Sequence, residues 1–320
     1  MATRAGAASP AVAAAAPAAR WREGLTTATY RLAAGAARAV PEGVALAAAR
    51  GGAAAVAGLL GRRGRVARRH QARVRGRPLT PAEQRRALRA AAASYARYWA
   101  ESLRLPATPP HVVDARFTIE GLERITGALA GGGPAPILAL PHLGGWDVGG
   151  SWLVRQGIPL TVVVEPLRPP ALFAWFAGLR RAAGLEVVAL GPGAGREVLA
   201  ALAGGRPVAL LADRDLDGRG VAVEFFGEVT TLPAGPATLA LRSGAPLLPT
   251  AVYFAGRGHH AVVRPPLDTS RRGSVRDDVA RITQALAVEL EGLVATAPEQ
   301  WHVFQPLWPS DRAEPGPSPP

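Results

Sequence analysis

The sequence predicts an α/β fold with a mostly parallel central sheet, helices on both faces of that sheet, and a helical N-terminal region. From Arg116 onward, short apolar runs alternate with segments of helical periodicity. Apolar strands that alternate with helices are typical of a parallel sheet covered on both faces. Residues 24–103 show helical periodicity throughout. The chain therefore divides into a helical part followed by an α/β part.

The apolar runs of the second part predict strands. They are Ile137–Leu140, Leu160–Glu165, Glu186–Leu190, Val208–Ala212, Val221–Phe225, Leu247–Phe254 and His260–Arg264. The segments between them predict helices near Gly121–Ala130, Trp146–Gln156, Ala171–Ala183, Arg196–Ala203, Ala234–Arg242 and Ser274–Ala295.

Three helices are expected in the first part. Two are Thr26–Val40 and Glu42–Arg62. The third begins after Thr80 and ends near Leu103. Its start has a capping box, because Thr80 can cap the helix and Glu83 follows three residues later. Pro81 occupies the first helical position, which favours proline.

The expected domain organisation is a single folded domain between two disordered ends. Residues 1–20 are an Ala-rich lead-in, and residues 311–320 are a Pro-rich tail. The domain spans residues 21–310 and consists of a helical part, 21–105, and an α/β part, 116–310.

The amino-acid composition excludes some kinds of functional site and favours one class of partner. The chain has no cysteine, which excludes disulfides, thiolate nucleophiles and cysteine metal sites. The formal net charge is +13, and arginine supplies every basic side chain apart from histidine. Codon usage in a GC-rich genome can explain part of that excess. The remainder favours a polyanionic partner, either nucleic acid or an anionic membrane surface.

No stretch is expected to span a membrane. The best candidate, Gly43–Leu60, consists mostly of Ala and Gly and carries Arg50. A central arginine costs about 2.5 kcal/mol on insertion. Residues 1–20 lack Leu, Ile and Phe, so a disordered lead-in is favoured over a signal peptide.

A histidine follows the apolar run Ile137–Leu140 after a single proline. His142 precedes a Gly-Gly pair, and Asp147 lies five residues beyond His142. A spacing of five is off a shared helix face, so the two side chains can meet only across a turn and a helix start. Such a carboxylate would orient the imidazole as a general base. The alternative is a structural histidine, with Asp147 favoured by the helix dipole.

Six strings in order resemble the bacterial lipid A biosynthesis acyltransferase superfamily, and within it the actinobacterial phosphatidylinositol mannoside acyltransferases. The strings are Pro141–Asp147, Val164–Leu167, Ala212–Leu216, Phe225–Glu228, Leu232–Pro236 and Trp301–Trp308. The first contains the histidine-x4-aspartate signature of glycerolipid acyltransferases. The resemblance implies an α/β sheet with a hydrophobic groove for the acyl chain, and transfer of an acyl group from a thioester directly to a hydroxyl.

The resemblance also implies roles for individual residues. His142 is the base and Asp147 its orienter, with no acyl-enzyme. The absence of a Gly-x-Ser-x-Gly elbow agrees, because it disfavours a serine hydrolase. In the mannoside enzymes a downstream glutamate completes the active centre. Glu224 is the candidate for that third acid, and Asp213 is its rival.

Five residues are candidates for substrate binding. Asp213, Arg214 and Asp215 follow an apolar strand, where open parallel sheets place their sites, and they can bind sugar hydroxyls or help to hold His142. Glu165 closes another strand. Arg180, near a helix end, can bind a phosphate of CoA or of a lipid head group, or cap its helix. No metal site is expected, and no cofactor beyond acyl-CoA as substrate. The segment Trp301–Trp308 is interpreted as packing, with a place along the acyl groove as the alternative.

An arginine-rich segment, 62–77, has three interpretations. It can lie on anionic phospholipid heads, bind nucleic acid, or form a solvated face. The segment lacks aromatic side chains for base stacking, which disfavours nucleic acid. The expected protein is thus an acyltransferase on the cytoplasmic face of the plasma membrane, with acyl-CoA and mannosylated phosphatidylinositol as partners. The alternatives are an acyltransferase of the lipid A or lysophospholipid type that uses acyl carrier protein, and a non-catalytic protein that binds anionic membranes or nucleic acid.

Overall fold

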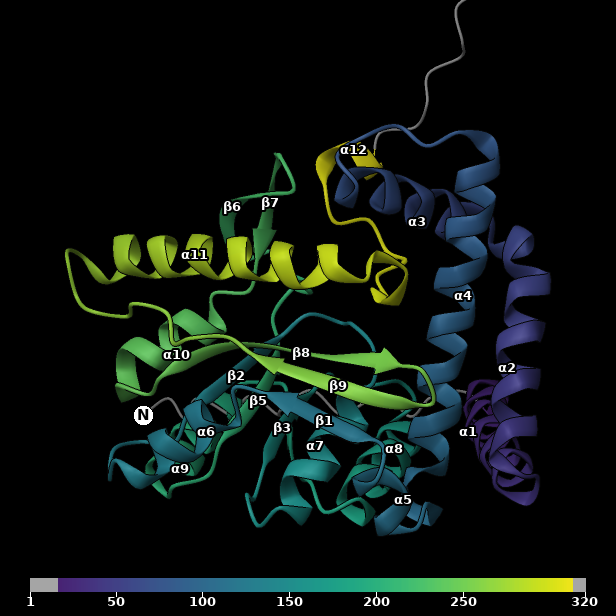
Figure 1. Ribbon diagram of the computed structural model, residues 1–320, viewed down its shortest axis with the longest axis horizontal. Helices are drawn as coiled ribbons and strands as arrows, with labels where there is room; N and C mark the ends of the chain where they lie inside the picture. Colours follow the sequence, from purple (N-terminus) through teal and green to yellow (C-terminus); the bar gives the residue numbers. More distant parts are fainter. Residues whose placement is uncertain (1–16, 313–320) are drawn as a thin grey trace, which may run out of the picture.

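A seven-stranded sheet forms the centre of the computed structural model, which describes residues 17–312 (Figure 1). The strand order is β1-β9-β8-β2-β5-β3-β4. Neighbouring strands are parallel, except that β8 and β9 are antiparallel. The strands are β1 (Phe117–Glu120), β2 (Ile137–Leu140), β3 (Thr161–Val164), β4 (Glu186–Ala189), β5 (Val208–Leu211), β8 (Leu247–Ala255) and β9 (Gly258–Val263). The predicted fold class is confirmed.

Helices cover both faces of the sheet. They are α6 (Leu122–Ala130), α7 (Trp146–Arg155), α8 (Pro170–Ala182), α9 (Ala194–Ala203), α10 (Gly235–Ser243) and α11 (Val275–Thr296). One buried cluster joins the sheet to α9, α10 and α11, through side chains such as Leu202 and Ile282. A second cluster joins the opposite face to α6 and α7, through Ile125 and Trp152. Two apolar layers therefore sandwich the sheet.

The N-terminal part is helical and lies at one end of the sheet (Figure 1). Its elements are α1 (Pro17–Ala39), α2 (Glu42–Val56), η1 (Ala57–Leu60), α3 (Gly61–Val74), α4 (Pro81–Arg104), η2 (Leu105–Ala107) and α5 (Pro110–Asp114). The capping box at the start of α4 is present: the Thr80 hydroxyl accepts from the Glu83 amide at 3.3 Å, and the Glu83 carboxylate accepts from the Thr80 amide at 2.8 Å. Helix α4 contacts α1, α2 and α3 on one side and α7 on the other, so it connects the two parts.

The sequence did not predict two strands, β1 and β7 (Glu228–Leu232). One predicted strand is not part of the central sheet. β6 (Val221–Phe225) forms an antiparallel hairpin with β7, separate from the central sheet. Val223 and Phe225 are buried on one side of β6, whereas Glu224 is exposed on the other. That alternation is typical of a strand with one solvated face.

At the N-terminus, α1 begins at Pro17, inside the expected lead-in 1–20. The rest of that lead-in, 1–16, and the end of the expected tail, 313–320, lie outside the described residues.

One continuous helical segment within residues 17–312, Glu42–Val74, is long and apolar enough to cross a membrane by length and composition. Its most apolar window has a mean hydropathy of 1.6, and 11% of that window is buried. Arg50 lies within the segment. Most of this apolar window is therefore exposed.

The C-terminal segment 298–312 passes from α11 across the loop after β2 to α3. It contains η3 (Pro298–Gln300) and α12 (Pro309–Arg312). His70 of α3 bonds through Nε2 to the Asp311 carboxylate at 2.8 Å and through Nδ1 to the Val303 carbonyl at 3.1 Å. The segment therefore ties the helical part to the sheet.

The loop that carries His142 is held between β8 and this C-terminal segment. The Gly144 amide donates to the Gln300 carbonyl at 3.0 Å, and the Gly145 amide donates to the Val252 carbonyl at 2.9 Å. The His302 amide donates to the carbonyl of His142 at 2.7 Å. Gly144 has φ of 62°, and a Cβ there would lie 2.0 Å from the Val252 carbonyl oxygen. Glycine is therefore required at this position.

Gly144→Ala is expected to lower the free energy of unfolding by about 3 kcal/mol or more, because strain adds to a backbone collision. Gly157→Ala is the matched control: its φ is 81°, but a Cβ would meet nothing within 4 Å. That variant should lose about 1 kcal/mol from the left-handed backbone alone. Urea denaturation measures both, and equal losses would contradict the collision.

Candidate functional site

Three adjacent parallel strands, β2, β5 and β3, end at the same edge of the sheet. The residues that follow them are His142, Asp213 and Glu165 in turn, each one or two positions past its strand. Carboxyl ends of parallel strands are where open α/β sheets bind their ligands. The strand order brings together residues that lie far apart in sequence.

His142 is held by Asp213 at two points. The Nδ1 atom of His142 lies 2.5 Å from Oδ1 of Asp213, and the His142 amide donates to Oδ2 at 2.8 Å. The indole Nε1 of Trp301 donates to the same Oδ2 at 2.7 Å. Asp213 is fully buried, with an exposed fraction of 0%. Burial alone would raise the pKa of Asp213, but the charge of His142 and these hydrogen bonds hold that pKa below its usual value.

This contact determines what the imidazole can do. A carboxylate at Nδ1 favours the tautomer in which Nδ1 carries the proton and Nε2 is free to accept one. The His142 side chain is 19% exposed and lines a cavity, so Nε2 is the nitrogen left for a substrate. The pair has the base-and-orienter arrangement that activates a hydroxyl.

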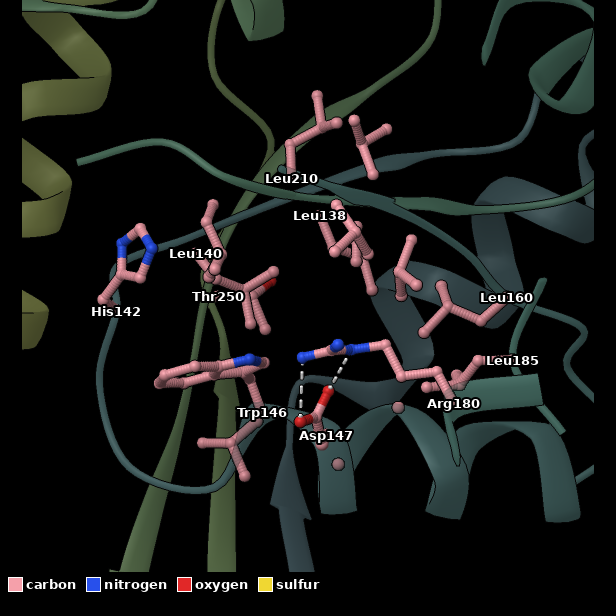
Figure 2. A pocket seen from close by; sticks show the side chains of 18 of the residues that line it. Leu138, Leu140, His142, Trp146, Asp147, Leu160, Arg180, Leu185, Leu210 and Thr250 are labelled. Atoms are coloured by element: carbon pink, nitrogen blue, oxygen red, sulfur yellow. Dashed lines mark hydrogen bonds and ion pairs between the residues drawn. The ribbon is translucent and has the colours of Figure 1, made fainter. Parts of the chain in front are cut away.

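Asp147 has other partners, which corrects the expected contact with His142. Its carboxylate pairs with Arg180, at 2.9 Å to Nε, and accepts hydrogen bonds from Tyr98 and Ser102 at 3.0 Å each. Figure 2 shows His142 on one side of Trp146 and the Asp147–Arg180 pair on the other. Asp147 lies in the first turn of α7, where its side chain meets α4 and α8. It therefore connects three helices beside the cavity.

Charge and burial keep that cluster in one state. Burial and then the charge of Asp147 raise the pKa of Tyr98 well above its usual value, so the phenol stays a donor. Burial alone would lower the pKa of Arg180, but the charges of Asp147 and Tyr98 and the hydrogen bonds to both together outweigh burial and raise that pKa. Arg180 lies near the end of α8, but its guanidinium forms an ion pair with Asp147 inside the protein.

The other predicted site residues separate into two groups. Glu165 and Arg214 line the cavity beside His142. Asp215 instead holds its own turn, where it accepts from the amides of Gly218 and Gly220 at 3.0 and 2.9 Å.

Glu224 is outside the cavity. It is exposed on the β6–β7 hairpin, and its backbone bonds to the side chain of Gln284 on α11. Of the two acids considered as a third catalytic group, the one that contacts His142 is Asp213.

The cavity beside His142 has a volume of about 210 Å³ and extends between the sheet and helices α7 and α8. Apolar side chains form most of its wall (Figure 2): Leu138, Leu140, Leu153, Leu160, Leu185 and Leu210. Such a wall favours a hydrocarbon chain. A base in the wall of an apolar cavity can act on a molecule whose apolar part lies inside.

His302 is a cavity residue that sequence reasoning passed over. It is 5% exposed, and Nε2 lies 2.9 Å from the Ser94 hydroxyl. Its Nδ1 has no hydrogen-bond partner within the part of the chain that the structure describes. Burial, and then the charge of His142, lower the pKa of His302 to about 3. The ring is therefore neutral at physiological pH.

In the sequence, the string Trp301–Trp308 marks this region, and packing is its first interpretation. Trp301 and Trp308 are almost fully buried, as that interpretation requires. His302 and Gln305 of the same string line the cavity, as the groove alternative requires. The indole of Trp301 also binds Asp213, which neither interpretation anticipated.

Comparisons with known proteins agree with the motifs. A family model described as bacterial lipid A biosynthesis acyltransferase matches residues 24–310. A phosphatidylinositol mannoside acyltransferase of Mycolicibacterium smegmatis is 44% identical over 251 residues, which cover 77% of this chain and 80% of the relative. Two proteins of that name from Mycobacterium tuberculosis strains are 45% identical over 227 residues, or 69% of this chain and 70% of each relative.

The low pKa of His302 predicts how the free energy of unfolding changes with pH. Its pKa falls from 6.5 to about 3 on folding, so below about pH 6.5 the unfolded chain takes up a proton that the folded chain refuses. Stability is therefore lost as the pH falls. Between about pH 6.5 and 5, wild type should lose about 2 kcal/mol more than His302→Gln. Urea denaturation at both values tests this, and parallel losses would refute it.

Proposed function

The chain belongs to the bacterial lipid A biosynthesis acyltransferase family, and on that basis we propose that it moves a fatty acyl group from acyl-CoA to a mannose hydroxyl of a phosphatidylinositol mannoside. The observation that carries the proposal is the His142–Asp213 pair, whose imidazole lines an apolar cavity. The names of the relatives supply the acceptor class.

The proposed reaction is a direct transfer. Nε2 of His142 removes the proton of the mannose hydroxyl as the oxygen attacks the thioester carbonyl carbon. The carbon–oxygen bond forms, the carbon–sulfur bond breaks, and the CoA thiolate takes the proton back from the imidazolium. Products are an ester and free CoA. Asp213 stabilises the transient imidazolium, because its buried carboxylate faces Nδ1.

The proposed substrates carry phosphate groups, which need cationic side chains beside the cavity. Arg214 lines the cavity and is half-buried. No hydrogen bond or ion pair of its side chain occurs among the residues that the structure describes. Arg180 is engaged by Asp147. We therefore assign the phosphate contact to Arg214, and to Arg180 and Asp147 the task of holding α4, α7 and α8 around the cavity.

Substitutions at His142, Asp213 and Asp147 distinguish the roles of the three residues. His142→Ala should lower kcat/KM about 1,000-fold, and Asp213→Asn about 100-fold or more, because the base or its orientation is lost. Asp147→Asn should cost only about tenfold through Arg180. Release of free CoA from palmitoyl-CoA, with mannosylated phosphatidylinositol as acceptor, measures all three.

Glu224→Gln serves as the comparison, since Glu224 is exposed on the hairpin, and should retain wild-type activity. Full transfer by either His142→Ala or Asp213→Asn would contradict the mechanism. Palmitoyl acyl carrier protein is tested in parallel, and a preference for it would overturn acyl-CoA as the donor.

We also propose that the enzyme is peripheral to the cytoplasmic face of the plasma membrane. Some arginines of the 62–77 segment are used internally: Arg73 pairs with Glu228, and Arg77 pairs with Glu83. Arg62 and Arg65 are exposed, and within residues 17–312 neither side chain has a hydrogen bond or ion pair. Leu59, 85% exposed, precedes them in the chain. Exposed cations beside an exposed apolar side chain suit an anionic lipid surface.

Arg62→Gln/Arg65→Gln should weaken binding to phosphatidylinositol-containing vesicles about 30-fold, because each arginine contributes about 1 kcal/mol near the surface. The matched control is Arg196→Gln/Arg276→Gln, which removes equal charge from exposed positions on α9 and α11. Vesicle sedimentation measures binding. Equal weakening by both pairs would indicate net charge in place of a defined membrane face.

A further inference from the structure

A second apolar cavity lies among the N-terminal helices. It has a volume of about 700 Å³, against about 210 Å³ for the cavity beside His142. Alanines form much of its wall, including Ala36 on α1, Ala49 and Ala53 on α2, and Ala96 on α4. Helices α1, α2 and α4 run side by side at one end of the molecule (Figure 1). This cavity is open to the surface, and a large exposed apolar hollow is typical of a binding site for an apolar group.

The second cavity opens at the surface through an apolar rim. Val40, Val44 and Val56 line it, and their exposed fractions are 37%, 56% and 51%. Arg63, exposed on α3, also lines it. The opening therefore combines apolar side chains with a cation, at the helical segment Glu42–Val74, whose most apolar window is only 11% buried. That chemistry matches an anionic lipid entering from a membrane.

The two cavities share part of their walls. Tyr95, Trp99, His302 and Gln305 line both. Side chains of α4 and of the C-terminal segment therefore form a wall common to both cavities. Among them, His302 is next to His142, because its amide donates to the His142 carbonyl at 2.7 Å.

The junction holds an unpaired polar atom. His302 is 5% exposed, its Nε2 faces Ser94, and its Nδ1 has no partner within residues 17–312. An unpaired buried polar atom is costly unless a ligand satisfies it. The combination of an apolar chamber and a polar atom at its inner end fits an amphiphile whose polar part lies by His142.

We propose that this second cavity binds one fatty acyl chain of the membrane lipid that carries the acceptor hydroxyl, with His302 Nδ1 at the polar end of that chain. The proposal rests on the proposed function. The donor chain has its own place in the cavity walled by leucines beside His142. The acceptor must reach the same histidine from the membrane, and the second cavity connects an apolar surface opening to that point.

The test fills the second cavity. Ala49→Phe on α2 and Ala36→Phe on α1 add a ring to two of its walls; Ala49 is half-buried and Ala36 is exposed, so neither change repacks a core. Ala47→Phe, exposed on the same helix but outside the lining, is the matched control. Each enzyme is assayed by CoA release with palmitoyl-CoA and two acceptors. These are dipalmitoyl phosphatidylinositol mannoside in mixed micelles and its deacylated, water-soluble form.

Filling the cavity should lower kcat/KM for the diacylated acceptor about tenfold in both variants. Transfer to the deacylated acceptor should match wild type, and Ala47→Phe should match wild type on both. Unchanged transfer to the diacylated acceptor by both filled variants would overturn the site. A loss of equal size with both acceptors would place the donor chain there instead, which overturns the choice of occupant. Absence of transfer by wild type to either acceptor would defeat the proposed function itself.

Discussion

The buried carboxylate of Asp213 is the interaction on which the site depends. A fully buried charge is tolerated only when it is paired and hydrogen-bonded. Asp213 meets that condition through the ring and amide of His142 and the indole of Trp301. Asp213 follows β5, whereas its two partner residues come from the loop after β2 and from the C-terminal segment. The same bonds that compensate the buried charge therefore fix the position of the imidazole.

A second buried carboxylate organises the surroundings. Asp147 accepts hydrogen bonds from α4 and pairs with Arg180 of α8, while it belongs to α7 itself. Because the three helices form one wall of the cavity beside His142, its shape depends on this polar cluster as well as on leucine packing. Tyr98 of the cluster also stacks on Trp146, with ring centroids 4.0 Å apart. Polar and apolar constraints thus meet at the start of α7.

Much of the fold could be predicted from short-range patterns. The strand Ile137–Leu140 has the predicted bounds, because a run of buried apolar residues ends at a proline that cannot continue the ladder. β1, by contrast, is only Phe117–Glu120 and alternates apolar with polar residues, a pattern too brief to stand out. The apolar run Val221–Phe225 predicted β6, the first strand of the hairpin. No local pattern indicated that this strand would lie outside the central sheet.

For the site residues too, short-range patterns predict positions but not long-range contacts. His142, Asp147, Glu165 and Arg214 all line the cavity, as expected of residues at strand ends and a helix start. The partner of His142 was not predictable from spacing, because the pairing follows from β2 lying next to β5 in the sheet. Proximity in sequence favoured Asp147, whereas proximity in space favours Asp213. Glu224 is an acid in a family string, but the alternation of β6 turns it to solvent.

The partners of Asp213 also determine when the site can form during synthesis. His142 and Trp301 lie 71 and 88 residues from Asp213 in sequence. On the ribosome, helices α1 to α4 emerge long before the indole that completes the site, because synthesis begins at the N-terminus. These helices, for which we propose contact with a membrane, can therefore fold while the His142 imidazole still lacks its full set of anchors. Assembly in this order would let the proposed membrane surface form before the site is complete.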